Sequence, residues 1–537
     1  MPTQTALHNK TFLLLGAVLL AGLLLRLPFL GSMSLCLDEM WSIGTSRMPW
    51  ASVLWVVFHQ DSNASLYYAL LHAWMRLGNS EATVRLLSVL LGLATIPPLY
   101  MLGKRLVNAQ VGLMASLLIA VNGFHIRFSQ EARAYSLVVL LITLSSLFFV
   151  KSVEQPTARN WCAYVLTSVL AVYVHAFAGL VLASHCVSLL FLPKRERRWR
   201  RVVTSFATIG VLVIPLGILL FARMREPMAP LAWVPKPTWR DIAGLFWLLA
   251  GNISSVTSPS SPRPTFREAL PGAPLLISYF VACLVMLVCS VKVWRSGRSC
   301  AAWRSGVPFA WLLVPIAVAV AVSIVKPIFV SKYLLVCLPG LALLVAIGLN
   351  SMPRWTAATA VVGIVILSLY ALPTYYQFRS RNHEWRMATD CLLTQARPGD
   401  SIIFFVAPGR LLFDYYRERY NGWINTAGQD IEVTYPAFGD ENHDPNVLAY
   451  MPPPPANLFT SGALHNHRIW LVLFHDNFSF TSELRQHIMA SLAASYRKAQ
   501  ENEFHGYGER VALVLYVSND TQVHSRNSAI QVAPYAQ

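Results

Sequence analysis

Charged residues are scarce in this chain. Asp, Glu, Lys and Arg make up 13% of its 537 residues, which is about half of the share that is usual in soluble domains. Hydrophobic residues make up 55%, and the mean hydropathy is +0.47. This balance excludes an ordinary soluble protein and indicates a polytopic α-helical membrane protein.

Cysteines are few, and they follow neither a disulfide framework nor a metal-binding motif. Six of the eight lie in or near apolar segments, where a thiol behaves as a small hydrophobic group. Only Cys36 and Cys391 fall in segments that we expect to be exposed, and the sequence leaves open whether they pair. The first apolar run lacks a small-residue cleavage site, so we expect it to stay as a membrane anchor.

Acidic residues are outnumbered by basic ones, 26 to 43, which gives a net charge of +17. In a soluble protein this excess would suggest a nucleic-acid partner. Here the densest basic run, residues 194–201, is flanked directly by apolar segments. We therefore expect no nucleic acid as a partner, and we interpret the basic loops as marks of the cytoplasmic side.

Eleven apolar segments are candidates for transmembrane helices. They are 12–30, 81–103, 110–124, 133–150, 160–175, 177–192, 202–221, 273–291, 307–325, 333–349 and 356–372. Basic loops follow the even-numbered segments, which predicts a cytoplasmic N-terminus and an extracytoplasmic C-terminal region. We expect the protein to lie in the inner (plasma) membrane. Arg26 is the one charge in the first segment, and we expect its side chain to snorkel to the interface.

Two domains follow from this pattern. Residues 1–372 form a transmembrane domain, and its long outer loop, residues 31–80, contains two amphipathic helical patterns at 40–59 and 66–77. A second outer segment, residues 223–272, is rich in Pro and Ser, and it is either a lid or a plain connector. Residues 373–537 form an extracytoplasmic α/β domain.

The C-terminal domain alternates short apolar runs with helical patterns. The runs 401–406, 469–474 and 511–517 predict strands, whereas 383–396, 408–420 and 481–497 predict helices. This alternation indicates a largely parallel sheet.

Ionisable residues gather on the predicted outer side, at the ends of the apolar segments. They are Asp38 and Glu39 after the first segment, Glu131 and Arg133 after the third, His175 at the end of the fifth, and Lys326 and Lys332 after the ninth. Plain structural roles are open for each: an acidic interfacial loop, a Glu131–Arg133 ion pair, a hydrogen-bonded His175. His185, inside the sixth segment, we interpret as structural.

Carboxylates and cations at one membrane surface suit transfer from a lipid phosphate. A carboxylate can accept a proton from an attacking hydroxyl, and cations can neutralise the departing phosphate. Adjacent residues do not share a helical face, so Asp38 and Glu39 have different tasks. One faces the substrate, and the other holds the loop or a cation.

Several motifs follow one another in a specific order. They are Asp38-Glu39, Asp61-Ser62-Asn63-Ala64-Ser65-Leu66-Tyr67-Tyr68, and the stretches 81–86, 128–135, 173–177, 332–339, 383–386 and 398–400. Together they resemble the GT-C membrane glycosyltransferases, within them the family of protein O-mannosyltransferases, the lipid A aminoarabinose transferase and the RgtA/B/C/D-like enzymes. Two departures stand out: Ala64-Ser65 replaces a usual Pro-Pro, and Lys332 replaces a common Arg.

The resemblance implies a polyprenyl-phosphate sugar donor, a lipid, glycan or protein acceptor, and an inverting displacement with Asp38 as base. From the charges that gather on the predicted outer side, Glu39 would be catalytic with Asp38, and Arg133, Lys332 and His175 would bind the donor phosphate. The supporting residues would be Glu131, Asp61, His125 and Tyr333. A divalent metal stays open, as do two rivals: a lipid or glycan transporter (flippase), and a receptor that binds through the C-terminal domain.

Overall fold

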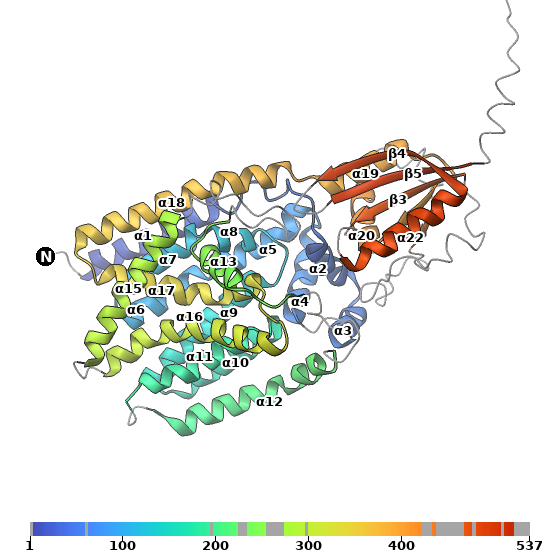
Figure 1. Cartoon of the computed structure of the whole chain (residues 1–537). Coiled ribbons are helices and arrows are strands. Elements are labelled where there is room, and N and C mark those ends of the chain that lie inside the picture. The colour runs from blue at the N-terminus through green and yellow to red at the C-terminus, as the bar shows by residue number, and fades with distance from the viewer. Residues whose placement is uncertain are drawn as a thin grey trace, which may run out of the picture. The chain divides into compact units, whose positions relative to one another are not determined.

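The computed structural model describes residues 4–59, 63–193, 197–223, 234–253, 273–295, 299–406, 408–419, 432–435, 467–474, 479–505 and 510–519. The chain forms two compact units (Figure 1). The helical unit comprises Met1–Leu30, Pro49–Val256 and Pro264–Gln377, and the sheet unit contains Gly31–Met48 and Phe378–Gln537.

The helical unit is built from long apolar helices and several shorter ones. They are α1 (Gln4–Leu24), α3 (Trp50–His59), α4 (Ser65–Trp74), α5 (Glu81–Ala94), α6 (Ile96–Leu106), α7 (Ala109–Val121), α8 (Gly123–Ser129), α9 (Tyr135–Glu154), α10 (Ala158–Val174), α11 (Ala178–Ser188), α12 (Trp199–Arg223), α13 (Trp239–Leu249), α15 (Ala273–Arg295), α16 (Ser299–Val325), α17 (Leu338–Asn350) and α18 (Arg354–Arg381), with the 3₁₀ helix η5 (Ser331–Cys337) before α17.

Each of the eleven predicted segments coincides with helix, but the count of eleven spans is not confirmed. Within the described part of the chain, seven helices are long and apolar enough to cross a membrane, or eight if the bent pair α7–α8 is one span. Of the other predicted segments, α1 and α10 are 21 and 17 residues long, and α11 with the turn that follows it forms the shorter apolar helix Ala178–Phe191. A polytopic helical membrane fold is therefore confirmed, with fewer helices of full spanning length.

The bend between α7 and α8 measures 62° and lies at Asn122. The Asn122 side chain accepts a hydrogen bond from the His125 N–H at 3.1 Å and donates one to the Leu249 carbonyl at 2.9 Å. A Cβ on Gly123 would lie 2.4 Å from the carbonyl oxygen of Gly251. The Asn-Gly pair thus caps α8 and allows the close approach of the α13 end.

Arg26 does not snorkel, contrary to our expectation. Its side chain is fully buried, and the guanidinium donates to the Gly22, Ala120 and Ile119 carbonyls at 2.8–3.2 Å. It also contacts His125 Nδ1 at 2.8 Å. The expectation was wrong because carbonyls freed at the α7–α8 bend accept these hydrogen bonds inside the protein.

The loop 31–80 contains more helix breaks than the pattern indicated. The predicted helix at 40–59 is two helices, α2 (Leu37–Arg47) and α3, separated at Met48-Pro49. Proline lacks the N–H that would continue a helix. The second pattern, 66–77, corresponds to α4 followed by a 3₁₀ turn at Met75–Leu77. The Ser- and Pro-rich stretch 254–262 lies outside the described residues.

The described residues of the sheet unit form five strands in the order β2-β1-β3-β5-β4. They are β1 (Ser401–Phe404), β2 (Glu432–Tyr435), β3 (Arg468–Phe474), β4 (Tyr496–His505) and β5 (Arg510–Ser518), with helices α19 (Glu384–Gln395), α20 (Pro408–Arg417) and α22 (Ser479–Ser495). The pairs β1–β2 and β1–β3 are parallel, but β3–β5 and β5–β4 are antiparallel. The α/β class is confirmed, and the largely parallel sheet was wrong.

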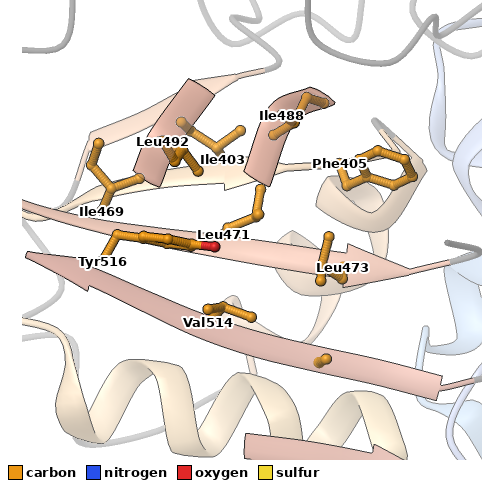
Figure 2. Packing of buried hydrophobic residues seen from close by; sticks show 10 residues of the cluster. Ile403, Phe405, Ile469, Leu471, Leu473, Ile488, Leu492, Val514 and Tyr516 are labelled. Atoms are coloured by element: carbon orange, nitrogen blue, oxygen red, sulfur yellow. The ribbon is translucent and has the colours of Figure 1, made fainter. Parts of the chain in front are cut away.

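The core of this unit follows the alternation of side chains along the strands. Ile403, Ile469 and Leu471 point to one face, where Ile488 and Leu492 of α22 pack on them (Figure 2). On the strand positions between them, Phe404 contacts the Phe413 ring of α20 and Phe474 contacts the Trp385 ring of α19. Helices therefore cover both faces of the sheet.

Candidate anion site around His175

His175 lies in the connection between α10 and α11 and is 5% exposed. Its Nδ1 accepts a hydrogen bond from the Phe177 N–H at 3.2 Å. In the neutral imidazole the proton is then on Nε2. Nε2 is buried and has no hydrogen-bond partner among the described residues. A buried N–H donor without an acceptor costs free energy, which points to a ligand.

Two cations act on this imidazole. Burial, and then the charges of Arg133 and Lys332, lower the pKa of His175 to about 3. His175 is therefore neutral at physiological pH, and it can donate a hydrogen bond without titrating. Arg133 and Lys332 are both partly exposed, so they remain accessible to a ligand.

Aromatic rings surround the cluster. The His175 ring lies 4.7 Å from that of Tyr333 and 6.4 Å from that of Tyr135, between ring centroids. The Arg133 guanidinium lies 5.9 Å from the Tyr135 ring, and the Lys332 ammonium lies 6.0 Å from the Tyr333 ring. We call Arg133, Tyr135, His175, Lys332 and Tyr333 the cation cluster. Its two positive charges and its N–H donor suit an anionic group.

The loop before α4 holds the His175 segment on both sides. The Asn63 side-chain oxygen accepts a hydrogen bond from the Ala176 N–H at 3.0 Å, and Ser65 Oγ donates to the Tyr173 carbonyl at 3.1 Å. Between them, Ala64 has φ +91°, in the left-handed region. Proline is excluded there because its φ is close to −65°. The Ala64-Ser65 departure thus permits a turn that the usual Pro-Pro could not form.

The remaining basic and acidic residues of this region have structural contacts. Glu131 forms an ion pair with Arg127 at 3.3 Å, a cation that the sequence analysis did not single out although the spacing is i, i+4. Ser88 Oγ donates to the Arg133 carbonyl at 3.3 Å, which fixes the backbone that carries the guanidinium.

His125 and His185 lie deeper in the helical unit. His125 contacts Arg26 through Nδ1, as described above, and its Nε2 is also buried without a hydrogen-bond partner among the described residues. His185 contacts the hydroxyls of Ser146 at 2.9 Å and Tyr164 at 3.3 Å, and stacks on Phe149 with ring centroids 4.5 Å apart. These contacts hold α9, α10 and α11 together.

Asp38 and Glu39 belong to the sheet unit, in the first turn of α2. Asp38 is exposed, whereas Glu39 is fully buried. Glu39 Oε2 accepts a hydrogen bond from the Cys36 N–H at 3.3 Å in a capping box. The adjacent carboxylates therefore differ in environment, and Glu39 holds the start of the helix.

The structure also bears on Asp61, on the pairing of Cys36 with Cys391 and on a metal site. Asp61 lies outside the described residues. Cys36 and Cys391 are free thiols and do not pair. In the described segments, no group of three or more His, Cys, Asp or Glu side chains could hold a metal ion.

A family model described as dolichyl-phosphate-mannose-protein mannosyltransferase matches residues 62–221. These residues contain Arg133 and His175. No curated protein sequence matches the chain.

Solved structures resemble the whole chain. ArnT from Cupriavidus metallidurans in the apo state has a TM-score of 0.56 and 15% identity, over 95% of this chain and 98% of ArnT. The chain has the GT-C fold. ArnT from the same organism bound to undecaprenyl phosphate has a TM-score of 0.53 and 16% identity, over 94% of this chain and 98% of ArnT. A third structure is the archaeal oligosaccharyltransferase AglB from Archaeoglobus fulgidus in complex with an inhibitory peptide and a dolichol-phosphate. Its TM-score is 0.50 and its identity is 12%, over 95% of this chain and 74% of AglB. The resemblance to GT-C glycosyltransferases is thus confirmed at the level of fold.

Proposed function

We propose that this GT-C protein is a glycosyltransferase that takes a sugar from a polyprenyl-phosphate donor. The acceptor is a lipid, a glycan or a protein at the outer face of the inner membrane. The cation cluster carries the proposal, because two cations and a neutral N–H donor suit a lipid-linked phosphodiester. The similarity to structures of ArnT with undecaprenyl phosphate and AglB with a dolichol-phosphate supports it.

The proposed reaction is a single displacement at the anomeric carbon. An acceptor hydroxyl attacks that carbon, the bond from carbon to the phosphate oxygen breaks, and the configuration inverts. Asp38 takes the hydroxyl proton late in the step, because the pKa of a free carboxyl is far below that of an alcohol. Polyprenyl phosphate leaves with the electron pair.

Each residue of the site has a defined task in this proposal. Arg133 and Lys332 neutralise the charge that develops on the leaving phosphate, and His175 Nε2 donates a hydrogen bond to one of its oxygens. Tyr333 forms part of the wall beside His175, at 4.7 Å between centroids. Glu39 maintains the α2 start that presents Asp38.

Purified protein in lipid vesicles would test the function. Radiolabelled polyprenyl-phosphate sugars are supplied with a membrane extract as the acceptor source, and transferred label and released polyprenyl phosphate are measured with and without EDTA. We expect sugar-dependent release by the wild type and a loss of at least about a hundredfold in Asp38→Asn. Asp390→Asn, an exposed carboxylate of α19, is the matched control and should retain full activity.

Two outcomes would contradict the proposal. One is the absence of release with every sugar tested. The other is movement of intact labelled donor across the bilayer without cleavage, which would favour the transporter.

A further inference from the structure

Within the sheet unit, the segment that carries Asp38 is held at its beginning by the C-terminal part of the chain. The Leu35 N–H donates a hydrogen bond to the Tyr416 hydroxyl at 2.8 Å, in a buried position. Tyr416 belongs to α20, about 380 residues further along the chain. The Ser34 N–H donates to the Asn382 carbonyl at 2.9 Å, and the Arg386 guanidinium donates to the Gly31 carbonyl at 3.2 Å.

The other end of α2 is held by the same region. Arg47, the last residue of α2, forms an ion pair with Glu418 at 2.7 Å. Its guanidinium also lies 5.8 Å from the ring centroid of Tyr415. The Arg47 and Glu418 side chains are 20% and 49% exposed, so this pair fixes geometry more than it adds stability.

These contacts leave α2 anchored at both ends by α20 and the residue that follows it. Between the anchors, Asp38 is exposed and Glu39 is buried. A base must stay within hydrogen-bond reach of the proton that it accepts, and a misplacement of about 1 Å can cost about a hundredfold in rate. An element that fixes α2 therefore fixes the carboxylate.

We propose that the sheet unit is a positioning element for Asp38, with Arg47, Tyr416 and Glu418 as positioning residues. The inference rests on the proposed function only in giving Asp38 the role of base. In this proposal the C-terminal region contributes to the chemical step, whether or not it also binds the acceptor. The sequence separation of the partners kept this relationship out of reach of the sequence analysis.

Charge exchange in the full-length protein tests the proposal. The variants are Arg47→Glu, Glu418→Arg, the double exchange, and Tyr416→Phe, with Arg497→Glu on the exposed part of β4 as the control. The first readout is backbone hydrogen exchange of residues 37–47, which needs no activity. The second is kcat and the donor KM with radiolabelled polyprenyl-phosphate mannose or whichever donor sugar proves active.

We expect faster exchange in residues 37–47 for each single variant, by about tenfold if the anchors limit local opening. We expect kcat to fall by about tenfold with the donor KM unchanged, because the phosphate contacts stay intact. The double exchange should restore both quantities. Tyr416→Phe, which keeps the ring and removes only the hydroxyl, should behave like the single charge variants.

Unchanged exchange in Arg47→Glu and Tyr416→Phe would overturn the proposal. So would faster exchange with an unchanged kcat, or no recovery of either quantity in the double exchange. If the wild type transfers no sugar, the proposed function fails, and the exchange data alone decide whether the sheet unit holds α2. A uniform loss of melting temperature that includes Arg497→Glu would mark general destabilisation and count against a specific anchor.

Discussion

The side-chain oxygen of Asn63 accepts a hydrogen bond from the Ala176 N–H at 3.0 Å, directly after His175 in the chain. With the hydrogen bond from Ser65 Oγ to the Tyr173 carbonyl, it connects the start of α4 to the segment that carries the imidazole of the cation cluster. The position of that imidazole therefore depends on residues more than a hundred positions away in the sequence.

Replacing Asn63 by Ala should loosen the His175 segment. The Ala176 N–H would lose its acceptor, which costs about 1 kcal/mol or more when the donor is partly buried. Asn63→Asp keeps the oxygen and should be milder. Melting temperature in detergent is the measurement, and donor KM is the second readout. Equal effects of the two variants would contradict a role for the side-chain oxygen.

Replacing Ala64 by glycine should stabilise the protein, and replacing it by proline should destabilise it. A left-handed conformation costs a non-glycine residue about 1 kcal/mol, so Ala64→Gly should raise the melting temperature slightly. Ala64→Pro should lower it strongly, since proline cannot adopt φ +91°. Ala69→Gly, inside α4, is the control and should be destabilising by about 0.5–1 kcal/mol. A stable Ala64→Pro variant would refute the described turn.

Donor use should depend on Arg133. Removal of one charge-assisted contact costs about 1.5–3 kcal/mol, so Arg133→Ala should weaken the donor dependence by about tenfold to a hundredfold. Lys332→Arg keeps the positive charge and should be tolerated. Transfer rates are measured against donor concentration at fixed acceptor. If Arg133→Ala leaves that dependence unchanged, the phosphate is bound elsewhere.

The neutral state of His175 predicts a specific pH response. Its pKa is about 3 in the folded protein and about 6.5 in the unfolded chain. Protonation then favours unfolding, so this stabilisation is complete above about pH 6.5 and is lost as the pH falls towards 3. His175→Gln should flatten the melting temperature between pH 6.5 and 4 relative to the wild type. Donor KM should show no transition between pH 6 and 8.5, and a transition near 6.5 that His175→Gln removes would contradict a neutral donor.

The membrane orientation is testable by labelling. In a cysteine-free background, a cysteine at the C-terminus should react with a membrane-impermeant thiol reagent from the outer side. A cysteine at position 198, within the basic loop, should react only after the membrane is permeabilised. The opposite pattern would reverse the predicted orientation and place Asp38 in the cytoplasm, where the proposed donor chemistry would have to be reconsidered.

Apolar length predicted the helices well, since a long apolar run has few alternatives to helix in a membrane. It could not predict that α11 is only 11 residues long, because a run of apolar letters does not show where a helix ends. Strand β4 was missed for a different reason. Its residues, from Tyr496 to His505, are mostly polar and exposed, and a solvated edge strand has no apolar signal.

The site was predictable in part. The ends of apolar segments pointed to Arg133, His175 and Lys332. In the structure, the charges of both cations act on the His175 imidazole and lower its pKa. The assignment of Arg127 as the partner of Glu131 needed coordinates, as did the buried state of Arg26. Contacts between residues far apart in the chain, such as Leu35 with Tyr416, leave no trace in a single sequence.

The buried guanidinium of Arg26 has a consequence for biogenesis. Its partners at positions 119, 120 and 125 are synthesised about a hundred residues after it. A lone arginine at the centre of a bilayer costs about 2.5–3.5 kcal/mol on insertion scales. Until α7 and α8 are synthesised, the guanidinium lacks these partners, so we expect it to reach its buried position only after they arrive.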